Sequence, residues 1–198
     1  MKEIEILYRS KDSLADIVKK IEKHNKNNND IFIFKGTKAT VDTYFESEKF
    51  NDLTPGSDGR LLSSLRLRDK DGIFYITHKK DIFNQDNIWL YSEELETEVG
   101  NIKMVDEILK KLHLKELLKI NNTKTIYENS KYEISIEDVV DLGFFVEIEF
   151  KLNVEILKEK VFEIKNNIRE LVLELDFCVG DEENAGKPEL LLKQFQEK

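Results

Sequence analysis

The sequence predicts an antiparallel α+β domain, and three observations support this fold class. Strand-like and helix-like segments are mixed along the whole chain. Residues 3–9, "EIEILYR", alternate charged and apolar side chains, which is the period of a half-buried strand. Several neighbouring strand segments are joined by short turns such as Asp71-Gly72 and Asn129-Ser130, as in hairpins. A parallel sheet would instead need a long crossover between successive strands.

Further strands are expected where β-branched and aromatic residues cluster between turn residues. The turn "LTPGSDG" contains Pro and Gly, which supply the backbone angles of tight turns, and the polar tract 25–30 is a loop. The expected strand segments are residues 31–36, 40–47, 61–69, 72–80, 89–99 and 142–150, with a hairpin over 123–139.

Three helices are expected because apolar residues recur at helical spacing. The first follows Asp12 or Ser13, and the second follows Asn101, because these side chains can cap a helix N-terminus. The third covers residues 155–175. Their apolar faces are Leu14, Ile17, Val18 and Ile21; Ile102, Val105, Ile108, Leu109 and Leu112; and Ile156, Val161, Ile164, Ile168, Leu171 and Leu175.

Composition limits the kind of protein this chain can be. Its 198 residues suit one domain spanning residues 1–198, with 40% apolar and 36% charged residues. The net charge of −9 argues against a nucleic-acid polymer as partner, because such proteins are usually basic. Cys178 is the single cysteine, so neither a disulfide framework nor a cysteine zinc site is expected. No apolar run has membrane-spanning length, so we expect a cytoplasmic protein without a membrane partner.

Carboxylates recur at every second position of three strand segments. Residues two apart on a strand share a face, so the pairs Glu3 with Glu5 and Glu147 with Glu149 each lie together, as do the glutamates of "ELETE". Each such face could simply be the solvent side of a sheet. Basic residues are also found on strand segments, however, and a closed barrel would direct alternate residues of every strand into one interior. These basic residues are Arg9, Arg66, Arg68, Lys79 and Lys124.

Such an interior would suit a metal-chelated polyphosphate. Carboxylate oxygens bind Mg²⁺ or Mn²⁺, and arginine and lysine bind phosphate oxygens. The negative charge of the whole chain is compatible with this ligand because bound metal ions offset part of it.

Taken in order, these segments resemble the CYTH family of triphosphate tunnel metalloenzymes. The matching segments are "EIEIL", "DTYF", "LRLR", "FYITHKK", "ELETE", "KTIY", "LGFFVEIE" and "KPELLL", which together extend over nearly the whole chain. The family includes class IV adenylate cyclases, thiamine triphosphatases and inorganic triphosphatases. The resemblance implies a closed antiparallel β-barrel, a tunnel of about eight strands with helices packed outside. "WLYSEELETEV" before a helix looks most like the cyclase-type branch.

The resemblance also implies roles for individual residues and a partner molecule. Mg²⁺ or Mn²⁺ would be the cofactor, and a triphosphate-containing small molecule the partner of a monomer or homodimer. The implied metal ligands are Glu3, Glu5, Glu96, Glu137, Glu147 and Glu149. The implied substrate-binding residues are Arg66, Arg68, Lys79 and Lys124, with Arg9 as an additional candidate. Lys79 and Tyr44 are the candidates for catalytic residues.

Three positions depart from the family pattern, because Leu7, Glu94 and Asn122 stand where basic residues are expected. The acidic side of the site is therefore kept while the basic side is weakened, although Arg9 or Lys79 could compensate. Three functions remain open at this point. They are hydrolysis of an inorganic or organic triphosphate, conversion of ATP to cyclic AMP and pyrophosphate, and binding of a polyphosphate or nucleotide by a non-catalytic sensor.

Overall fold

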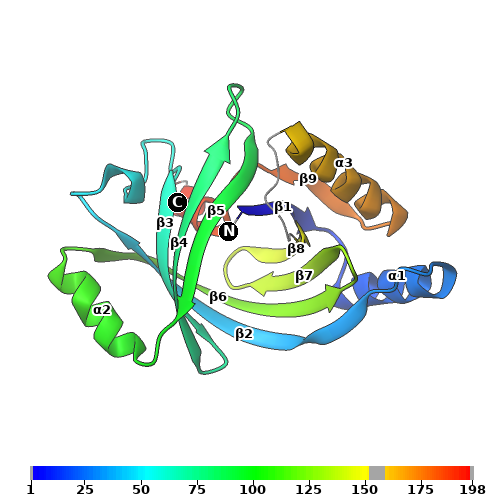
Figure 1. The fold of residues 1–198 in the computed structure, drawn as a ribbon, viewed down its shortest axis with the longest axis horizontal. Coiled ribbons are helices and arrows are strands. Elements are labelled where there is room, and N and C mark those ends of the chain that lie inside the picture. The colour runs from blue at the N-terminus through cyan, green and yellow to red at the C-terminus, as the bar shows by residue number, and fades with distance from the viewer. Residues whose placement is uncertain (1, 152–158, 197–198) are drawn as a thin grey trace.

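The predicted closed antiparallel barrel is confirmed by a computed structural model that describes residues 2–151 and 159–196. The sheet runs in the order β5-β4-β3-β2-β6-β7-β8-β1, and pairing of Glu3 with Ser92 joins β1 to β5 and closes the barrel (Figure 1). A short strand β9 also pairs with β1. The strands are β1 (Lys2–Ser10), β2 (Ile33–Glu46), β3 (Ser63–Lys70), β4 (Ile73–Phe83), β5 (Trp89–Glu98), β6 (Lys115–Glu128), β7 (Tyr132–Val139), β8 (Gly143–Phe150) and β9 (Val179–Glu183).

The helices α1, α2 and α3 lie outside the barrel, as expected (Figure 1). Ser13 is the N-cap of the first helix, because its hydroxyl accepts a hydrogen bond from the Asp16 amide at 3.2 Å. Asn101 caps the second in the same way. The helices are α1 (Leu14–Asn27), α2 (Ile102–Lys111), α3 (Glu159–Glu174) and α4 (Lys187–Gln196), with a 3₁₀ turn η1 (Asn51–Leu53).

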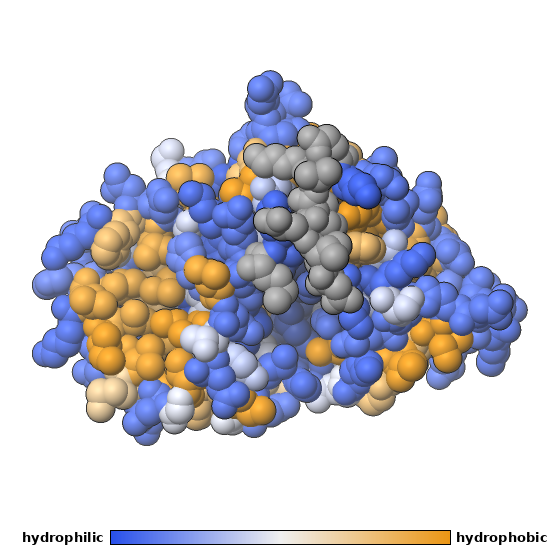
Figure 2. Space-filling model, in the orientation of Figure 1, coloured by the Kyte–Doolittle hydropathy of each residue, from blue (hydrophilic) through white to orange (hydrophobic). Residues whose placement is uncertain are grey.

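The predicted apolar faces of α1 and α3 are largely buried, whereas that of α2 is not. Ile17 and Ile21 of α1 are fully buried, and α3 buries the predicted positions from Val161 to Leu175. Ile156 lies outside the described residues. Ile108 and Leu112 are half exposed or more, and apolar surface gathers over the region of α2 (Figure 2).

Several boundaries differ from those the sequence predicts. Two strands are expected over residues 31–36 and 40–47, but the single strand β2 (Ile33–Glu46) covers most of both, with a register shift between Phe34 and Gly36. Gly36 has φ 128°, a conformation that glycine adopts readily, so the strand continues through it. Strand β6 begins at Lys115, earlier than expected. Its first residues pair with β2, and exposed and buried residues alternate along much of it. Strand β9 and helix α4 were not predicted.

The turn at Asp71-Gly72 is confirmed as a hairpin turn. Asp71 has φ 53° and Gly72 has φ 82°, the pair of positive angles typical of a two-residue hairpin loop. The turn joins β3 to β4, which are paired along their length from Ser63 to Lys80. It therefore fixes which residues of β3 and β4 face the barrel interior.

The main apolar core lies outside the barrel, between its wall and helices α1 and α3. Ile4 and Ile6 of β1 and Ile148 of β8 point outward and belong to this core. Because side chains alternate along a strand, the glutamates between these isoleucines point into the barrel. The alternating sequence pattern thus buries its apolar half under helices and its charged half in the interior.

An apolar cluster closes one side of the interior. It contains Leu7, Tyr44 and Phe145 from barrel strands and Leu191 from α4, and we call it the apolar plug; its other members are Leu118, Ile120, Val139 and Leu142. Leu7, Tyr44 and Ile120 also line the interior cavity. The plug therefore sets how far along β1 a side chain can reach the cavity.

Candidate active-site tunnel

The barrel encloses a cavity of about 210 Å³ that is lined by charged side chains. Every one of the eight barrel strands contributes to its wall, from Glu3 and Glu5 on β1 to Glu147 and Glu149 on β8. The start of α4 adds Lys187. The glutamate pairs therefore face a shared interior rather than the solvent side of an open sheet.

Lys79 joins two of the predicted metal ligands. Its Nζ lies 3.1 Å from Glu3 Oε2 and 2.7 Å from Glu5 Oε1. Burial alone would lower the pKa of Lys79, but the carboxylates of Glu5 and Glu3 raise it well above its ordinary value. Lys79 is thus a permanent cation on β4 that pairs with two carboxylates of β1.

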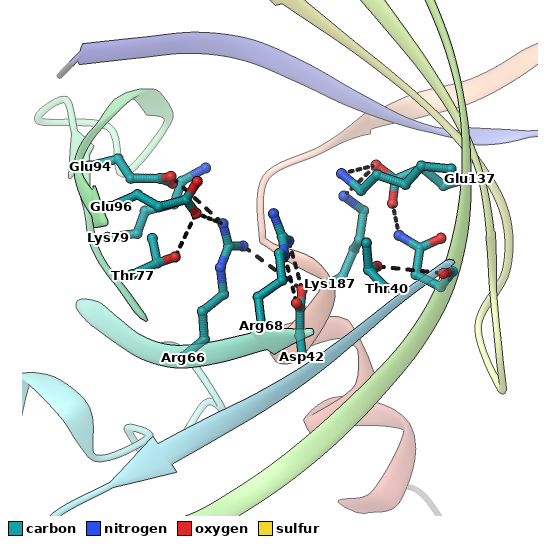
Figure 3. Close-up of polar contacts among 12 residues, drawn as sticks. Thr40, Asp42, Arg66, Arg68, Thr77, Lys79, Glu94, Glu96, Glu137 and Lys187 are labelled. Atoms are coloured by element: carbon teal, nitrogen blue, oxygen red, sulfur yellow. Dashed lines mark hydrogen bonds and ion pairs between the residues drawn. The ribbon is translucent and has the colours of Figure 1, made fainter. Parts of the chain in front are cut away.

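A second group combines two carboxylates with two lysines, and Figure 3 shows Glu137 and Lys187 from this group. Lys124 Nζ lies 2.8 Å from Glu137 Oε1 and 3.5 Å from Glu147 Oε1. Lys187 Nζ lies 3.0 Å from the same Glu137 oxygen and 2.5 Å from Glu147 Oε2. Burial would raise the pKa of Glu147, but Lys124 and Lys187 hold it well below its ordinary value. Glu137 has no exposed surface, so the two lysines provide its charge compensation.

Glu149 lies in a different electrostatic environment from Glu147, although both line the cavity. Glu149 is paired in register with Glu5 across β8 and β1. Burial and the nearby carboxylates of Glu3 and Glu5 raise the pKa of Glu149 to about 9. At neutral pH the Glu149 carboxyl group is therefore protonated, and a cation bound beside it would favour its ionised form.

The two arginines of "LRLR" face carboxylates from other strands (Figure 3). Arg68 donates from Nε and Nη2 to the two oxygens of Asp42, both at 2.7 Å. Arg66 Nη2 lies 3.7 Å from Glu94 and 3.6 Å from Glu96. The paired, two-pronged contact with Asp42 fixes the plane of the Arg68 guanidinium, which is how arginine is set to bind a phosphate.

The two candidate catalytic residues both line the cavity. Tyr44 on β2 is the register partner of Arg66 on β3, and Tyr44 and Asp42 raise the pKa of Arg66 against the opposing effect of burial. Tyr44 also belongs to the apolar plug. Tyr44 and Lys79 therefore occupy different walls of one cavity, on β2 and β4.

Arg9, the additional substrate-binding candidate, lies outside the cavity. Its Nη1 donates to the Leu142 carbonyl at 2.8 Å, its Nε pairs with Glu183, and 47% of its side chain is exposed. Arg9 lies on the same face of β1 as Glu3 and Glu5, but it comes after Leu7, which belongs to the apolar plug. It is not part of the cavity wall, because the plug lies between it and the cavity.

The three departures from the family pattern have structural explanations. Leu7 packs in the apolar plug, opposite Glu147 in the strand register. Glu94 faces Arg66, and burial raises its pKa to about 7. Asn122 donates from Nδ2 to Glu137 Oε2. The three residues thus form contacts within the tunnel wall.

Lys187 and Asp42 are two cavity-lining residues that the sequence patterns did not predict. Lys187 stands in "KPELLL" at the start of helix α4 and not on a strand, so strand periodicity could not reveal it. A lysine directly before Pro188 at a helix start was the available signal, because proline favours the first helical turn. Lys187 supplies an ammonium group to Glu147, the register partner of Leu7, where the family pattern leads one to expect a lysine.

The tunnel fits a divalent cation by the chemistry of its donors. Its carboxylate oxygens are the hard ligands that Mg²⁺ and Mn²⁺ prefer. Asn122 Oδ1 is buried and accepts no hydrogen bond within the described residues, so it is an oxygen that lacks a donor or cation. No three acidic or imidazole side chains in residues 2–151 and 159–196 are arranged as a ready metal site. The lysines described above instead bridge the carboxylates in pairs.

Similarity to known proteins agrees with this architecture. A protein of Methanocaldococcus jannaschii named as a putative adenylate cyclase is 37% identical over 100 residues, which are 50% of this chain and 56% of that protein. The chain thus matches little more than half the length of this curated relative. A solved structure from Pyrococcus horikoshii OT3 has a TM-score of 0.73 and 25% identity, over 95% of this chain and 98% of that one.

A solved structure from Vibrio parahaemolyticus, described as a putative adenylate cyclase, has a TM-score of 0.69 at 15% identity, over 96% and 97% of the two chains, and shows the fold alone. None of the helices described here combines the length and apolar composition needed to cross a membrane. The family model of the CYTH domain matches residues 1–176, which include all eight strands of the barrel. The protein therefore belongs to the CYTH domain family.

Proposed function

We propose that this protein hydrolyses the triphosphate part of an inorganic or organic small molecule, with Mg²⁺ or Mn²⁺ as cofactor. The observation that carries the proposal is the meeting of guanidinium, ammonium and carboxylate groups around one enclosed cavity. A triphosphate carries several negative charges on adjacent groups, so its binding needs several cations and a metal together. A cavity of about 210 Å³ suits such a chain of phosphates.

Arg66, Arg68 and Lys124 are the proposed phosphate-binding residues. Each has a charged nitrogen in the cavity wall, and they come from the neighbouring strands β3 and β6 on either side of β2. Asp42 on β2 holds Arg68 by two hydrogen bonds, so Arg68 enters the reaction with its orientation already set. Tyr44 is proposed to orient Arg66 in a similar way, from the apolar side of the cavity.

The carboxylates are the proposed ligands of the cofactor. Glu137 and Glu147 with Asn122 form one candidate set, and Glu3 with Glu5 and Glu149 forms another; Glu96 lies apart, against Thr77 and Arg66. When bound, the metal would neutralise phosphate charge and act as a Lewis acid. Lys79 remains charged between Glu3 and Glu5 and would keep these carboxylates oriented toward the cavity.

Cyclisation of ATP is the second candidate, and the name of the Methanocaldococcus jannaschii relative favours it. In this reaction the ribose 3′-hydroxyl replaces water as the nucleophile, and pyrophosphate leaves. The same phosphate-binding residues would serve both reactions, because a fold does not by itself decide the chemistry. The two candidates differ in the atom that attacks and in their products.

The test is incubation of the purified protein with tripolyphosphate, ATP or thiamine triphosphate and with Mg²⁺ or Mn²⁺. Phosphate release supports hydrolysis, whereas cyclic AMP with pyrophosphate supports cyclisation. Tight binding of a triphosphate without turnover would overturn the enzyme proposal and leave a sensor. Absence of both binding and turnover, with metal affinity unchanged in Glu147→Gln, would overturn the tunnel site as a whole.

A matched pair of arginine variants sharpens this test. Arg66→Gln removes a cation from the cavity wall, and we expect turnover to fall by roughly a hundredfold or more, as for loss of one charge-stabilising group. Arg9→Gln removes a cation of the same kind outside the cavity and should leave turnover unchanged. Equal effects of the two substitutions would contradict the assignment of the cavity as the active site.

A further inference from the structure

Lys187 forms ion pairs with carboxylate oxygens of Glu137 and Glu147 that a metal cation would also need as ligands. It lies at the first residue of α4, and its Nζ contacts Glu137 Oε1 at 3.0 Å and Glu147 Oε2 at 2.5 Å. The other oxygen of Glu137 accepts a hydrogen bond from Asn122. An incoming cation at this pair of carboxylates must therefore compete with an ammonium group that already bridges them.

The backbone around Lys187 is held by contacts that do not involve its side chain. Asn184 Oδ1 accepts a hydrogen bond from the Trp89 amide at 2.7 Å, three residues before Lys187. Two residues after it, Glu189 Oε1 accepts one from the Leu61 amide at 2.9 Å, and Glu189 Oε2 accepts one from the Gly186 amide at 2.6 Å. The long lysine side chain can consequently leave the carboxylates by rotation about its own bonds, while the start of α4 stays attached to the barrel.

Lys124 contacts the same carboxylates but is placed differently. It stands on β6 directly opposite Glu137 on β7, so the strand register holds the two residues side by side. Lys187 comes instead from the start of helix α4, so no strand register holds it beside Glu137. Departure of the Lys187 ammonium group would therefore leave the cross-strand pair of Lys124 and Glu137 intact.

We propose that Lys187 and a divalent cation compete for Glu137 and Glu147, so that Lys187 acts as an internal counter-ion that withdraws when the cation binds. This inference rests on the proposed function, because it concerns the same metal site. Asn122 supports it: its Oδ1 is buried beside Glu137 and accepts no hydrogen bond in the described part of the chain. A cation at Glu137 and Glu147 would give this oxygen a partner, which the Lys187 contacts do not.

The proposal predicts that removal of Lys187 strengthens metal binding. We would measure Mn²⁺ affinity without any triphosphate, from the electron paramagnetic resonance signal of free Mn²⁺ and by isothermal titration calorimetry. Lys187→Met should bind Mn²⁺ roughly tenfold more tightly or better, because one close charge changes such an equilibrium by a factor of ten or more. Lys187→Arg keeps the charge and should bind close to the wild-type protein.

Lys193→Met is the matched control, because Lys193 is exposed on the same helix and its loss changes net charge equally. Unchanged or weaker Mn²⁺ binding in Lys187→Met, with binding intact in the wild type, would overturn this inference and leave the proposed function standing. No Mn²⁺ binding by the wild type, Lys187→Met or Lys187→Arg would overturn the metal site itself. Lys124 still pairs with Glu137 in both variants, and urea unfolding would verify that each is folded.

Discussion

Replacing Asp42 with asparagine tests the pair that orients Arg68. Asp42 is buried and accepts two hydrogen bonds of 2.7 Å from the Arg68 guanidinium, and Arg66 Nη1 lies 4.0 Å away. The Asp42→Asn substitution would keep the shape of the side chain but remove its charge. The guanidinium of Arg68 would then remain in the tunnel wall without its carboxylate.

The magnitude follows from the burial of the pair. Breaking a buried ion pair by removing one partner costs about 3–5 kcal/mol, and the residual exposure of Arg68 together with one retained hydrogen bond reduces this to about 2 kcal/mol. For a chain of this length the melting temperature should fall by about 4–8 °C. The effect requires ionised Asp42, whose pKa is lowered by Arg68 and Arg66 against the opposing effect of burial. It is therefore complete at neutral pH and is lost as the pH falls through the folded-state pKa.

A double-mutant cycle with Asp42→Asn and Arg68→Gln measures the interaction itself. Urea unfolding at pH 7 of the wild type, both single variants and the double variant should give a coupling free energy of about 2 kcal/mol. Asp52→Asn, at an exposed position, is the control and should change stability by less than about 0.5 kcal/mol. Additive effects of the two tunnel substitutions would refute the view that Asp42 fixes Arg68.

Three further predictions concern stability. Burial lowers the pKa of Lys165 to about 8, so the charged side chain destabilises the fold below pH 8. Relative to Lys165→Met, the unfolding free energy of the wild type should rise by about 2 kcal/mol from pH 7 to 9.5. A difference between the two proteins that does not change with pH would contradict this. Leu191→Ala should cost about 2–4 kcal/mol in calorimetry because it opens the apolar plug, and a neutral result would show that the plug repacks freely. Gly143→Ala should cost about 1 kcal/mol through its φ of 94° alone, whereas Gly100→Ala, where a methyl group likewise meets nothing within 4 Å, should be nearly neutral in the same denaturation assay.

The alternation of residue types was enough to predict much of this protein. Strands such as β1 and β8 carry isoleucine on one face and glutamate on the other, and this alternation does not depend on which strands pair in the sheet. Helix caps at Ser13 and Asn101 are also local, because each cap contacts an amide only a few residues away. The fold class and most elements follow from such short-range relations.

Other features required contacts between residues far apart in the chain. Arg9 has the right position in the strand alternation to face the tunnel but lies beyond the apolar plug, which brings Leu191 of α4 together with Leu7 of β1 and Phe145 of β8. Lys187 reaches Glu137 and Glu147 across separations of 50 and 40 residues. No local pattern specifies such a meeting, because it depends on how the chain after α3 returns to the barrel.

The sequence by itself therefore determined which side chains alternate, and with them an antiparallel sheet that has one charged face. Only the tertiary structure decided that this face is the interior, since that depends on the closure of β1 onto β5. It also decided which cation neutralises each carboxylate. The physical reason is that periodicity is a property of the backbone, whereas charge pairing depends on distances of 2.5–4.0 Å between atoms that only folding brings together.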